Sequence, residues 1–338
     1  MYNIFHKETI MHPNYKNYNY KDPLFVTSSK AWCSVCNNEE PLKSTCTNCK
    51  STGYQPVNLN GMWYPSSGFL VCGGPSINKI PYQRLRERGI VSLAVNNVAA
   101  HVPVSAWCFS DPQTKFHHGL FLDPKCITFT PVPKLRRHII AKLPNKKFQQ
   151  MDARVRHCPS SFGFARKTTF HAETFLTSEF SYWGRGGKQP ENDKPFQCLC
   201  TMLLGFRLMH YLGCPRIYLL GVDFWMEKDK QNYAFVQEKS ARNGRYKNEN
   251  AYLKELKPVF DAAGFEVFNC NKESKCDVFQ YVPFEEALED CRGGVPLEPF
   301  DTEHYYSKSI AKKDMEENPK TINIAELAEL QRDDKKTS

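Results

Sequence analysis

The sequence predicts an α/β protein: a Rossmann-like parallel sheet with helices on both faces, plus a small N-terminal zinc-knuckle module. Between about residues 66 and 290, short apolar runs alternate with helical segments, which is typical of parallel α/β sheets. Several of these apolar runs end in glycine or polar residues. Two Cys-x2-Cys pairs lie ahead of this region. A chain of 338 residues is long enough for one large domain or two.

The strands and helices of the central region are expected where apolar runs are bounded by turn residues. The predicted strands are 68–72, 91–95, 106–110, 126–130, 216–220 and 266–268. The predicted helices are 82–88, 196–212, 248–263 and 283–289. The helix 196–212 is the clearest, because it is apolar nearly all round, ends at Gly213 and precedes a strand.

The composition divides the chain into four parts. Residues 1–29 are polar and tyrosine-rich and predict an extended arm, and 30–58 contain the paired cysteines. Residues 66–292 form the expected Rossmann-like nucleotide-binding catalytic domain. Residues 293–338 form a charged extension in which 322–331 could be an amphipathic helix.

No apolar run approaches the roughly 20 residues that span a bilayer. The first residues lack the apolar core of a signal peptide. We therefore expect no membrane insertion and a cytoplasmic location.

The paired cysteines predict a structural zinc site. Cys33, Cys36, Cys46 and Cys49 have the spacing C-x2-C, nine residues, C-x2-C. Four thiolates complete a tetrahedral zinc shell with no open position, which stabilises a segment too short for its own core. The lysines around the module could contact nucleic acid, or the knuckle could only support the fold or a partner contact. The other ten cysteines are scattered and are expected to be core residues.

The formal net charge is +9. Such a charge favours an anionic partner, such as a nucleotide, a phosphorylated substrate or DNA. The stretch 134–137, Lys-Leu-Arg-Arg, adds to this expectation. A basic surface with no specific partner is the alternative.

Four predicted strands end in residues of the kind that nucleotide sites use. Gly73-Gly74-Pro75-Ser76 follows the first, Asn96 the second, Asp111 the third, and Gly221-Val222-Asp223 a later one. Ligands of parallel sheets bind at the carboxyl ends of the strands. Glycines allow a close approach to phosphate, and amides and carboxylates can contact a base or ribose. One such end predicts only a turn, whereas four together predict a nucleotide site.

The order of these motifs resembles a known family. Gly-Pro-Ser after the first strand, Asn after the second, Asp-Pro after the third, the long helix, and Tyr-Leu-Leu-Gly-Val-Asp-Phe at 218–224 followed by Tyr-Ala-Phe at 233–235 are similar to the bacterial CMP-sialic-acid-dependent sialyltransferases. They are also similar to the related motility-accessory-factor and 6-hydroxymethylpterin diphosphokinase-like proteins. The resemblance covers about residues 66–290.

The resemblance implies a set of nucleotide-binding residues. Gly73, Gly74 and Ser76 would hold the phosphate or ribose, and Asn96, Asp111 and Thr201 would contact the nucleotide. Trp225 and Tyr233 match aromatic positions that hydrogen-bond the leaving phosphate.

Several positions depart from the family's pattern. Asp111 stands where the family often has asparagine, and Trp225 stands where it usually has tyrosine. Cys72 stands at its first loop glycine, and Arg245 stands where the sialyltransferases place a catalytic histidine. Arginine stays protonated and cannot act as a base, but it can stabilise a departing phosphate. The candidates for a base are Asp111, His117, His118, Asp223 and Glu227. His117 and His118 are alternatively exposed loop histidines, and Asp223 is alternatively a brace. The sequence contains no Asp-x-Asp pair at a strand end.

Three functions follow from this. The first is a glycosyltransferase that moves a sugar from a nucleotide-sugar donor to an acceptor hydroxyl, with a hydroxymethylated base in DNA as the specific guess and a glycan as its rival. The second is a Mg²⁺-dependent diphosphokinase. The third is a non-catalytic nucleic-acid-binding protein on the same fold.

Overall fold

The computed structural model describes residues 25–27, 58–123, 126–142, 148–158, 161–186, 198–228, 230, 232–235, 243–293 and 319–322. The four cysteines of the predicted zinc module, Cys33, Cys36, Cys46 and Cys49, lie outside the described residues. So do most of the predicted arm and of the C-terminal extension.

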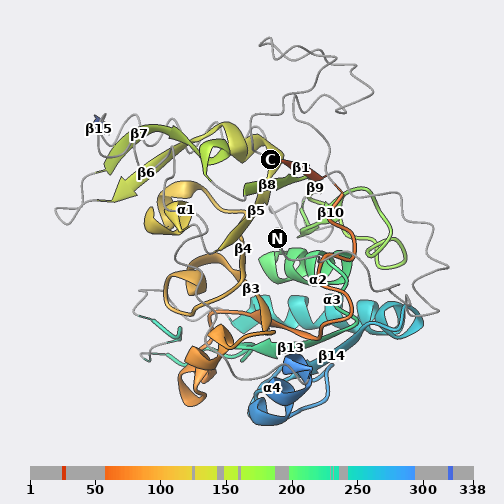
Figure 1. Cartoon of the computed structure of the whole chain (residues 1–338). Helices are drawn as coiled ribbons and strands as arrows, with labels where there is room; N and C mark the ends of the chain where they lie inside the picture. Colours follow the sequence, from red (N-terminus) through yellow and green to blue (C-terminus); the bar gives the residue numbers. More distant parts are fainter. Residues whose placement is uncertain are drawn as a thin grey trace.

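The fold is built on an eight-stranded sheet with the order β1-β8-β5-β4-β3-β2-β13-β14 (Figure 1). Its strands are β1 (Phe25–Thr27), β2 (Gly68–Val71), β3 (Val91–Val95), β4 (Ala106–Cys108), β5 (Ile127–Pro131), β8 (Ser161–Phe164), β13 (Arg216–Leu220) and β14 (Glu266–Asn269). All neighbours in this sheet are parallel except β1, which pairs antiparallel with β8 at the edge.

The strand order reverses beside β2. After β2 the chain continues outward through β3, β4 and β5, and β13 later returns to the other side of β2. In register, Leu70 of β2 faces Leu93 of β3 and Leu219 of β13. The carboxyl ends of β2 and β13 therefore form the switch point at which open parallel sheets bind ligands.

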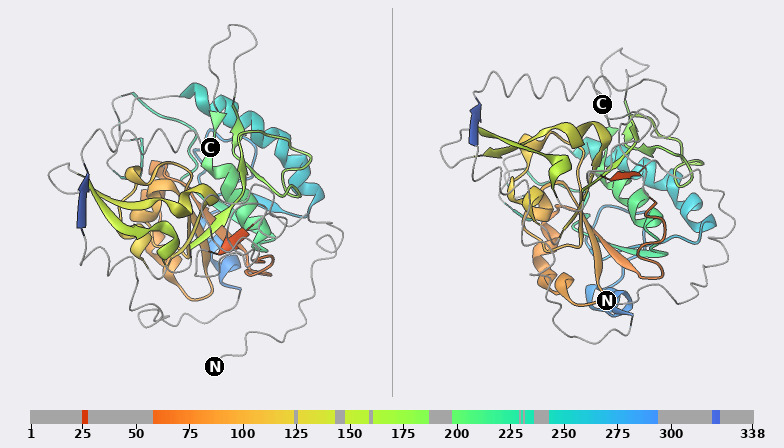
Figure 2. Two further views of the ribbon diagram at one scale, coloured as in Figure 1. Left: turned by 90° about the horizontal axis from the view of Figure 1, so that it is seen from above. Right: turned by 45° about the horizontal axis from the view of Figure 1, so that its top comes forward.

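Two long helices cover one face of the sheet. α2 (Thr201–Tyr211) is buried along its whole length, and α3 (Asn243–Ala262) lies beside it (Figures 1 and 2). A Cβ atom on Gly205 of α2 would come within 2.5 Å of Leu70. The glycine therefore lets α2 lie directly on the centre of the sheet.

The opposite face is covered by shorter elements. Phe69 and Val71 alternate with Leu70 and point to this side, where they pack with η1 (Pro75–Lys79), η2 (Tyr82–Arg86), η3 (Asn96–Ala100) and α4 (Phe284–Arg292). Further along the sheet, α1 (Gly119–Leu122) packs against the buried Trp107 and Phe109. Helical elements thus lie on both faces, as predicted.

Smaller sheets complete the described part of the chain. β6 (His138–Lys142) and β7 (Phe148–Arg154) form a hairpin that extends from the side of the central sheet, with β15 (Pro319–Ile322) along β7 (Figures 1 and 2). β9 (Arg166–Lys167) pairs with β10 (Ser181–Tyr182), and β11 (Gly184–Arg185) pairs with β12 (Cys198–Leu199). Three short 3₁₀ elements lie along the chain between these parts: η4 (Gln113–Lys115) between β4 and α1, η5 (Val132–Arg136) between β5 and β6, and η6 (Val155–His157) between β7 and β8.

Most predicted elements of the central region are confirmed, with shifted ends. All six predicted strands are present. The prediction of an α-helix at 82–88 is wrong in type, because η2 is a short 3₁₀ helix. The predicted helix 196–212 begins only at Thr201, because Cys198 and Leu199 form β12.

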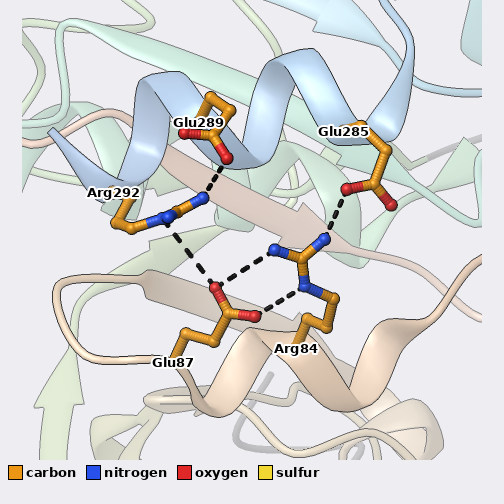
Figure 3. A network of polar contacts seen from close by, with 5 residues as sticks. All are labelled: Arg84, Glu87, Glu285, Glu289 and Arg292. Carbon is orange, nitrogen blue, oxygen red and sulfur yellow. Dashed lines mark hydrogen bonds and ion pairs between the residues drawn. The ribbon is translucent and has the colours of Figure 1, made fainter. Parts of the chain in front are cut away.

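An ion-pair cluster joins η2 to α4 (Figure 3). Arg84 donates from Nε to Glu87 at 2.6 Å and from Nη1 to Glu285 of α4. Arg292 of α4 lies 3.9 Å from Glu87 and donates to Glu289. We refer to these five residues, Arg84, Glu87, Glu285, Glu289 and Arg292, as the η2–α4 cluster.

Within the described part of the chain, no helix is long and apolar enough to cross a membrane.

Candidate functional site

The glycine loop after β2 is packed directly against the loop after β13. The Gly74 N–H donates to the Gly221 carbonyl at 2.9 Å. A Cβ atom on Gly74 would lie 2.5 Å from that carbonyl oxygen and 2.6 Å from Asp223 Oδ2. Gly221 itself has φ +65°, and a Cβ there would lie 2.2 Å from the Cys72 carbonyl oxygen. Both glycines are therefore required by the close approach of the two backbones.

Asp223 holds the glycine loop in place. Its Oδ2 accepts the Ser76 N–H at 3.0 Å, and its Oδ1 accepts the Ser76 hydroxyl. Oδ1 also accepts Asn271 Nδ2 at 2.7 Å. Because both carboxylate oxygens are occupied, the arrangement favours a bracing role over the role of a base. Asp223 and Ser76 were predicted at the same site, and they are in direct contact.

Asn96 combines an unusual backbone conformation with an amide oxygen that is unpaired in the described part of the chain. It has φ +57°, which non-glycine residues seldom adopt. Its Nδ2 donates to Thr201 Oγ1 at 3.1 Å, and its carbonyl accepts the Trp107 Nε1–H at 2.9 Å. Its Oδ1 is buried and finds no donor among the described residues. A buried acceptor without a donor is costly, so a hydroxyl or amino group of a ligand would satisfy it.

Residues 233–235 lie over the glycine loop. The Ala234 N–H donates to the Gly73 carbonyl at 3.0 Å, and the Ala234 carbonyl accepts Asn78 Nδ2 at 2.9 Å. The ring of Tyr233 is 3.4 Å from the point where a Gly73 Cβ would stand. Tyr233 is therefore next to the predicted phosphate-binding backbone.

The loop after Asp223 presents Trp225 to solvent. Phe224 has φ +53° and stacks on Tyr246 with ring centroids 5.2 Å apart. Met226 is buried and exchanges two hydrogen bonds, of 2.7 and 2.8 Å, with the side chain of Asn243. Trp225, between these two anchored residues, is 51% exposed.

Arg245 lies in the first turns of α3 and is held on its inner side. Its Nε donates to Glu249 Oε1 at 2.7 Å, and its Nη2 donates to the Leu199 carbonyl. Glu249 is buried, and burial raises the pKa of its carboxyl group, while Arg245 opposes that rise. The sequence reasoning missed Glu249. The spacing of four residues from Arg245 was the available signal, but the predicted helix began at 248 and left Arg245 outside it, whereas α3 begins at Asn243.

Asp111 and His117 stand apart from these contacts. Asp111 follows β4 and pairs with Lys115 Nζ at 3.0 Å. His117 stacks on His118 at 4.5 Å, and its Nδ1 accepts the Gly119 N–H at 3.1 Å. Burial and the neighbouring His117 lower the pKa of His118. Within the described residues, no hydrogen bond or ion pair that we find joins Asp111 or His117 to Gly74, Asn96 or Arg245.

The described residues contain no group of three or more histidine, cysteine, aspartate or glutamate side chains that could hold a metal ion. Lys134, part of the predicted basic stretch, is 3% exposed. The charge of Lys134 is therefore not offered at the surface.

Comparisons with known proteins find similarity among solved structures. No protein-family model and no curated protein matches the chain. The MAf glycosyltransferase from Magnetospirillum magneticum AMB-1 aligns over 69% of this chain and 35% of its own, with 11% identity and a TM-score of 0.38. This chain thus spans about a third of that protein's length. The sialyltransferase CstII from Campylobacter jejuni in complex with cytidine-5'-monophosphate aligns over 70% and 91%, with 11% identity and a TM-score of 0.34.

The same sialyltransferase in complex with CMP-3FNeuAc aligns over 70% and 92%, with a TM-score of 0.32. These proteins belong to the two groups that the motif order resembles. Because all of these TM-scores are below 0.5, the functional proposal rests on the contacts within this chain.

Proposed function

We propose that this protein is a glycosyltransferase that moves a sugar from a nucleotide-sugar donor to an acceptor hydroxyl. One observation carries the proposal: the Gly74–Gly221, Ser76–Asp223 and Asn96–Thr201 contacts meet at the ends of three adjacent strands, β13, β2 and β3. These ends include the switch point, where open parallel sheets bind nucleotides.

The donor would lie across these strand ends. The backbone of Gly73 and Gly74 would face its phosphate, braced by Ser76 and Asp223. Asn96 Oδ1 would accept a hydrogen bond from a ribose hydroxyl or a base amino group. Thr201 would orient the Asn96 amide through the 3.1 Å hydrogen bond.

The leaving phosphate would be stabilised by donors around the glycine loop. Tyr233 offers a hydroxyl, Trp225 an indole N–H and Arg245 a charged guanidinium. In the reaction, the acceptor oxygen bonds to the anomeric carbon while the bond from that carbon to the phosphate oxygen breaks. The bonding electrons leave with the phosphate, and fixed donors that face this developing charge lower the barrier.

The acceptor proton would pass to Asp111. His117 is the weaker candidate, because its Nδ1 accepts the Gly119 N–H. In neutral His117, Nδ1 is therefore occupied as an acceptor and Nε2 carries the ring proton. Neither nitrogen has a free lone pair to take the proton of the acceptor hydroxyl. Asp111 follows β4, two strands from β2, and at about 4.8 Å per strand the ends of these two strands are about 10 Å apart. That distance leaves room for the sugar.

The proposed acceptor is a large anionic molecule, with a hydroxymethylated base in DNA as the specific candidate. The net charge of +9 supports an anionic acceptor. A glycan acceptor is the alternative, and following a labelled sugar from the donor onto DNA or onto a glycan distinguishes the two.

The test is incubation with CMP-, UDP- and GDP-sugars, followed by measurement of released nucleotide. One donor class should be consumed, and Asn96→Ala should slow its consumption. Phosphotransfer that stops when Mg²⁺ is chelated would contradict the proposal and favour the diphosphokinase. Salt-sensitive DNA binding with no turnover of any donor would favour the non-catalytic protein.

We also propose that Cys33, Cys36, Cys46 and Cys49 bind one structural zinc ion. The spacing of the two Cys-x2-Cys pairs supports this. Metal analysis of the purified protein should give one zinc per chain, and Cys33→Ser should lower that content. Full zinc content in Cys33→Ser would exclude ligation by these four cysteines.

A further inference from the structure

Arg245 and Glu249 form an ion pair on α3 in which the arginine is exposed and the carboxylate is buried. The Arg245 side chain is 51% exposed, whereas that of Glu249 is 7% exposed. The two are linked by the Nε to Oε1 hydrogen bond of 2.7 Å. An ordinary surface pair four residues apart on a helix has both partners in water and contributes little. Here the carboxylate lies inside the protein.

Burial of the Glu249 carboxylate has an energetic cost that other contacts must offset. Isolating a carboxylate from water is costly unless it is paired. Burial raises the pKa of Glu249, and both Arg245 and the Cys200 thiol act in the opposite direction by hydrogen bonding. The ion pair thus offsets the cost of burying the Glu249 carboxylate without a clear net gain in stability. This points to a role in arranging the site.

The inner edge of the guanidinium is fixed from two elements. Nε is held by Glu249 of α3, and Nη2 is held by the carbonyl of Leu199 in β12. Among the described residues, Nη1 makes no hydrogen bond that we find. A guanidinium held along one edge presents its other N–H groups in a set direction, since the group is planar and rigid.

The segments that hold and follow Arg245 lead to residues of the proposed site. Leu199 is two residues before Thr201, which binds the Asn96 amide. Tyr246, the next residue in the chain, stacks on Phe224 in the loop that carries Trp225. Arg245 is therefore linked through Leu199 to the segment that carries Thr201, and through Tyr246 to the loop that carries Trp225.

We infer that Glu249 is a positioning residue that aims the outer edge of Arg245 at the phosphate of the bound nucleotide. This inference rests on the proposed function for the identity of the ligand. Without Glu249, the long arginine side chain would regain rotamer freedom, and its charge would no longer be held in one place. Glu249 itself touches no phosphate and acts only through Arg245.

A double-mutant cycle tests this coupling. Calorimetry would measure the binding of CMP, UDP, GDP and pyrophosphate, with the matching nucleosides as phosphate-free controls. Glu249→Ala and Arg245→Ala should each weaken the binding of phosphate-containing ligands about tenfold. The double variant should be no weaker than either single variant, because Glu249 acts through Arg245. Binding of the nucleosides should be unchanged.

Two further variants keep the test clear if Glu249→Ala folds poorly. Glu249→Gln retains an acceptor oxygen for Arg245 Nε and should restore most of the affinity. Arg245→Lys retains the charge without the planar fork and should remain weak. Glu255→Gln is the matched control: Glu255 lies on the same helix, pairs with Arg185 at 3.0 Å and is largely exposed, and its loss should not change phosphate affinity.

The outcomes separate the inference from the proposed function. Additive effects in the cycle, or an equal loss of nucleoside binding, would overturn the positioning role even if nucleotide sugars are turned over. Coupled loss of phosphate binding without any sugar transfer would support the positioning role and contradict the glycosyltransferase. Absence of binding for every nucleotide and for pyrophosphate would overturn both.

Discussion

The η2–α4 cluster and the site at the ends of β2, β3 and β13 are both rich in polar contacts, but their unpaired atoms differ. In the cluster, Arg292 Nε lacks a hydrogen-bond acceptor among the described residues but lies 3.9 Å from the Glu87 carboxylate. In the η2–α4 cluster each charged side chain has an opposite charge within the cluster (Figure 3). At the site, Asn96 leaves a buried oxygen without a donor, and Arg245 has only its inner edge engaged.

The two regions also differ in backbone conformation. The site contains both non-glycine residues with positive φ in the described chain, Asn96 and Phe224, whereas neither lies in η2 or α4. Backbone strain that persists tends to mark functional positions. We therefore expect the η2–α4 cluster to stabilise the fold and the strand ends to bind the ligand.

The largest effect is expected from Gly74→Ala. The new Cβ would lie 2.5 Å from the Gly221 carbonyl oxygen and 2.6 Å from Asp223 Oδ2, and neither the backbone nor the braced carboxylate can move easily. We expect a loss of about 3 kcal/mol in the free energy of unfolding, together with loss of nucleotide binding. Urea unfolding and calorimetry measure the two effects.

Gly244→Ala in α3 is the matched control for this substitution. A Cβ there meets nothing within 4 Å, so stability should stay the same or rise slightly. Unchanged stability and unchanged nucleotide affinity in Gly74→Ala would show that the two loops can separate, and the proposed phosphate position would be lost.

The next largest effect is expected from a change of pH. It tests whether the acid sensitivity of the free energy of unfolding arises in either polar region. His210, in the last turn of α2, is fully buried, and burial together with the nearby Arg207 charge lowers its pKa to about 3. The unfolded chain binds this proton near pH 6.5, so stability is complete above that pH and is lost as the pH falls. Between pH 7 and 5 the loss should be on the order of 2 kcal/mol.

His210→Phe should flatten this slope in urea titrations at several pH values. His171→Phe is the control, because His171 is exposed, and it should leave the slope unchanged. If the free energy of unfolding of His210→Phe still fell with pH as in the wild type, the acid-sensitive group would lie elsewhere, with the two polar regions as the next candidates.

The sheet was predictable because its strands are locally marked. β2, β3 and β13 are apolar runs that end in glycine or asparagine, and their parallel pairing follows from the alternation with helices. β12 was missed for the opposite reason. Cys198 and Leu199 are as apolar as α2, and only their pairing with β11 makes them a strand.

The site was predictable at its glycines and only partly elsewhere. Gly74 and Asp223 could be placed at neighbouring strand ends, because the carboxyl ends of parallel strands share one edge of the sheet. Asp223 contacts the glycine loop through Ser76, a residue 147 positions away in the sequence, and only the tertiary structure reveals this contact. Glu249 was missed because its burial depends on β12 and on Arg245, which no local pattern reveals.

Asn96→Gly separates binding from folding at the site. Glycine removes the cost of φ +57° and keeps the backbone carbonyl that accepts the Trp107 N–H. It removes the side-chain amide that would contact the nucleotide. Nucleotide affinity should fall about tenfold while the free energy of unfolding changes by less than about 1 kcal/mol. An affinity equal to that of the wild type would show that the unpaired Oδ1 faces no ligand.

The smallest effect is expected in the η2–α4 cluster. Arg84→Ala removes the contacts to Glu87 and Glu285. Because the Arg84 side chain is 31% exposed and that of Glu285 is 63% exposed, solvent screens much of the interaction, and the loss should be no more than about 1 kcal/mol. Nucleotide affinity should not change.

Lys257→Ala, which breaks the exposed pair with Asp261 in α3, should cost less, because that pair joins residues of one helix and not two separate elements. If Arg84→Ala instead weakened nucleotide binding with no loss of stability, the division between a stabilising cluster and a binding edge would fail.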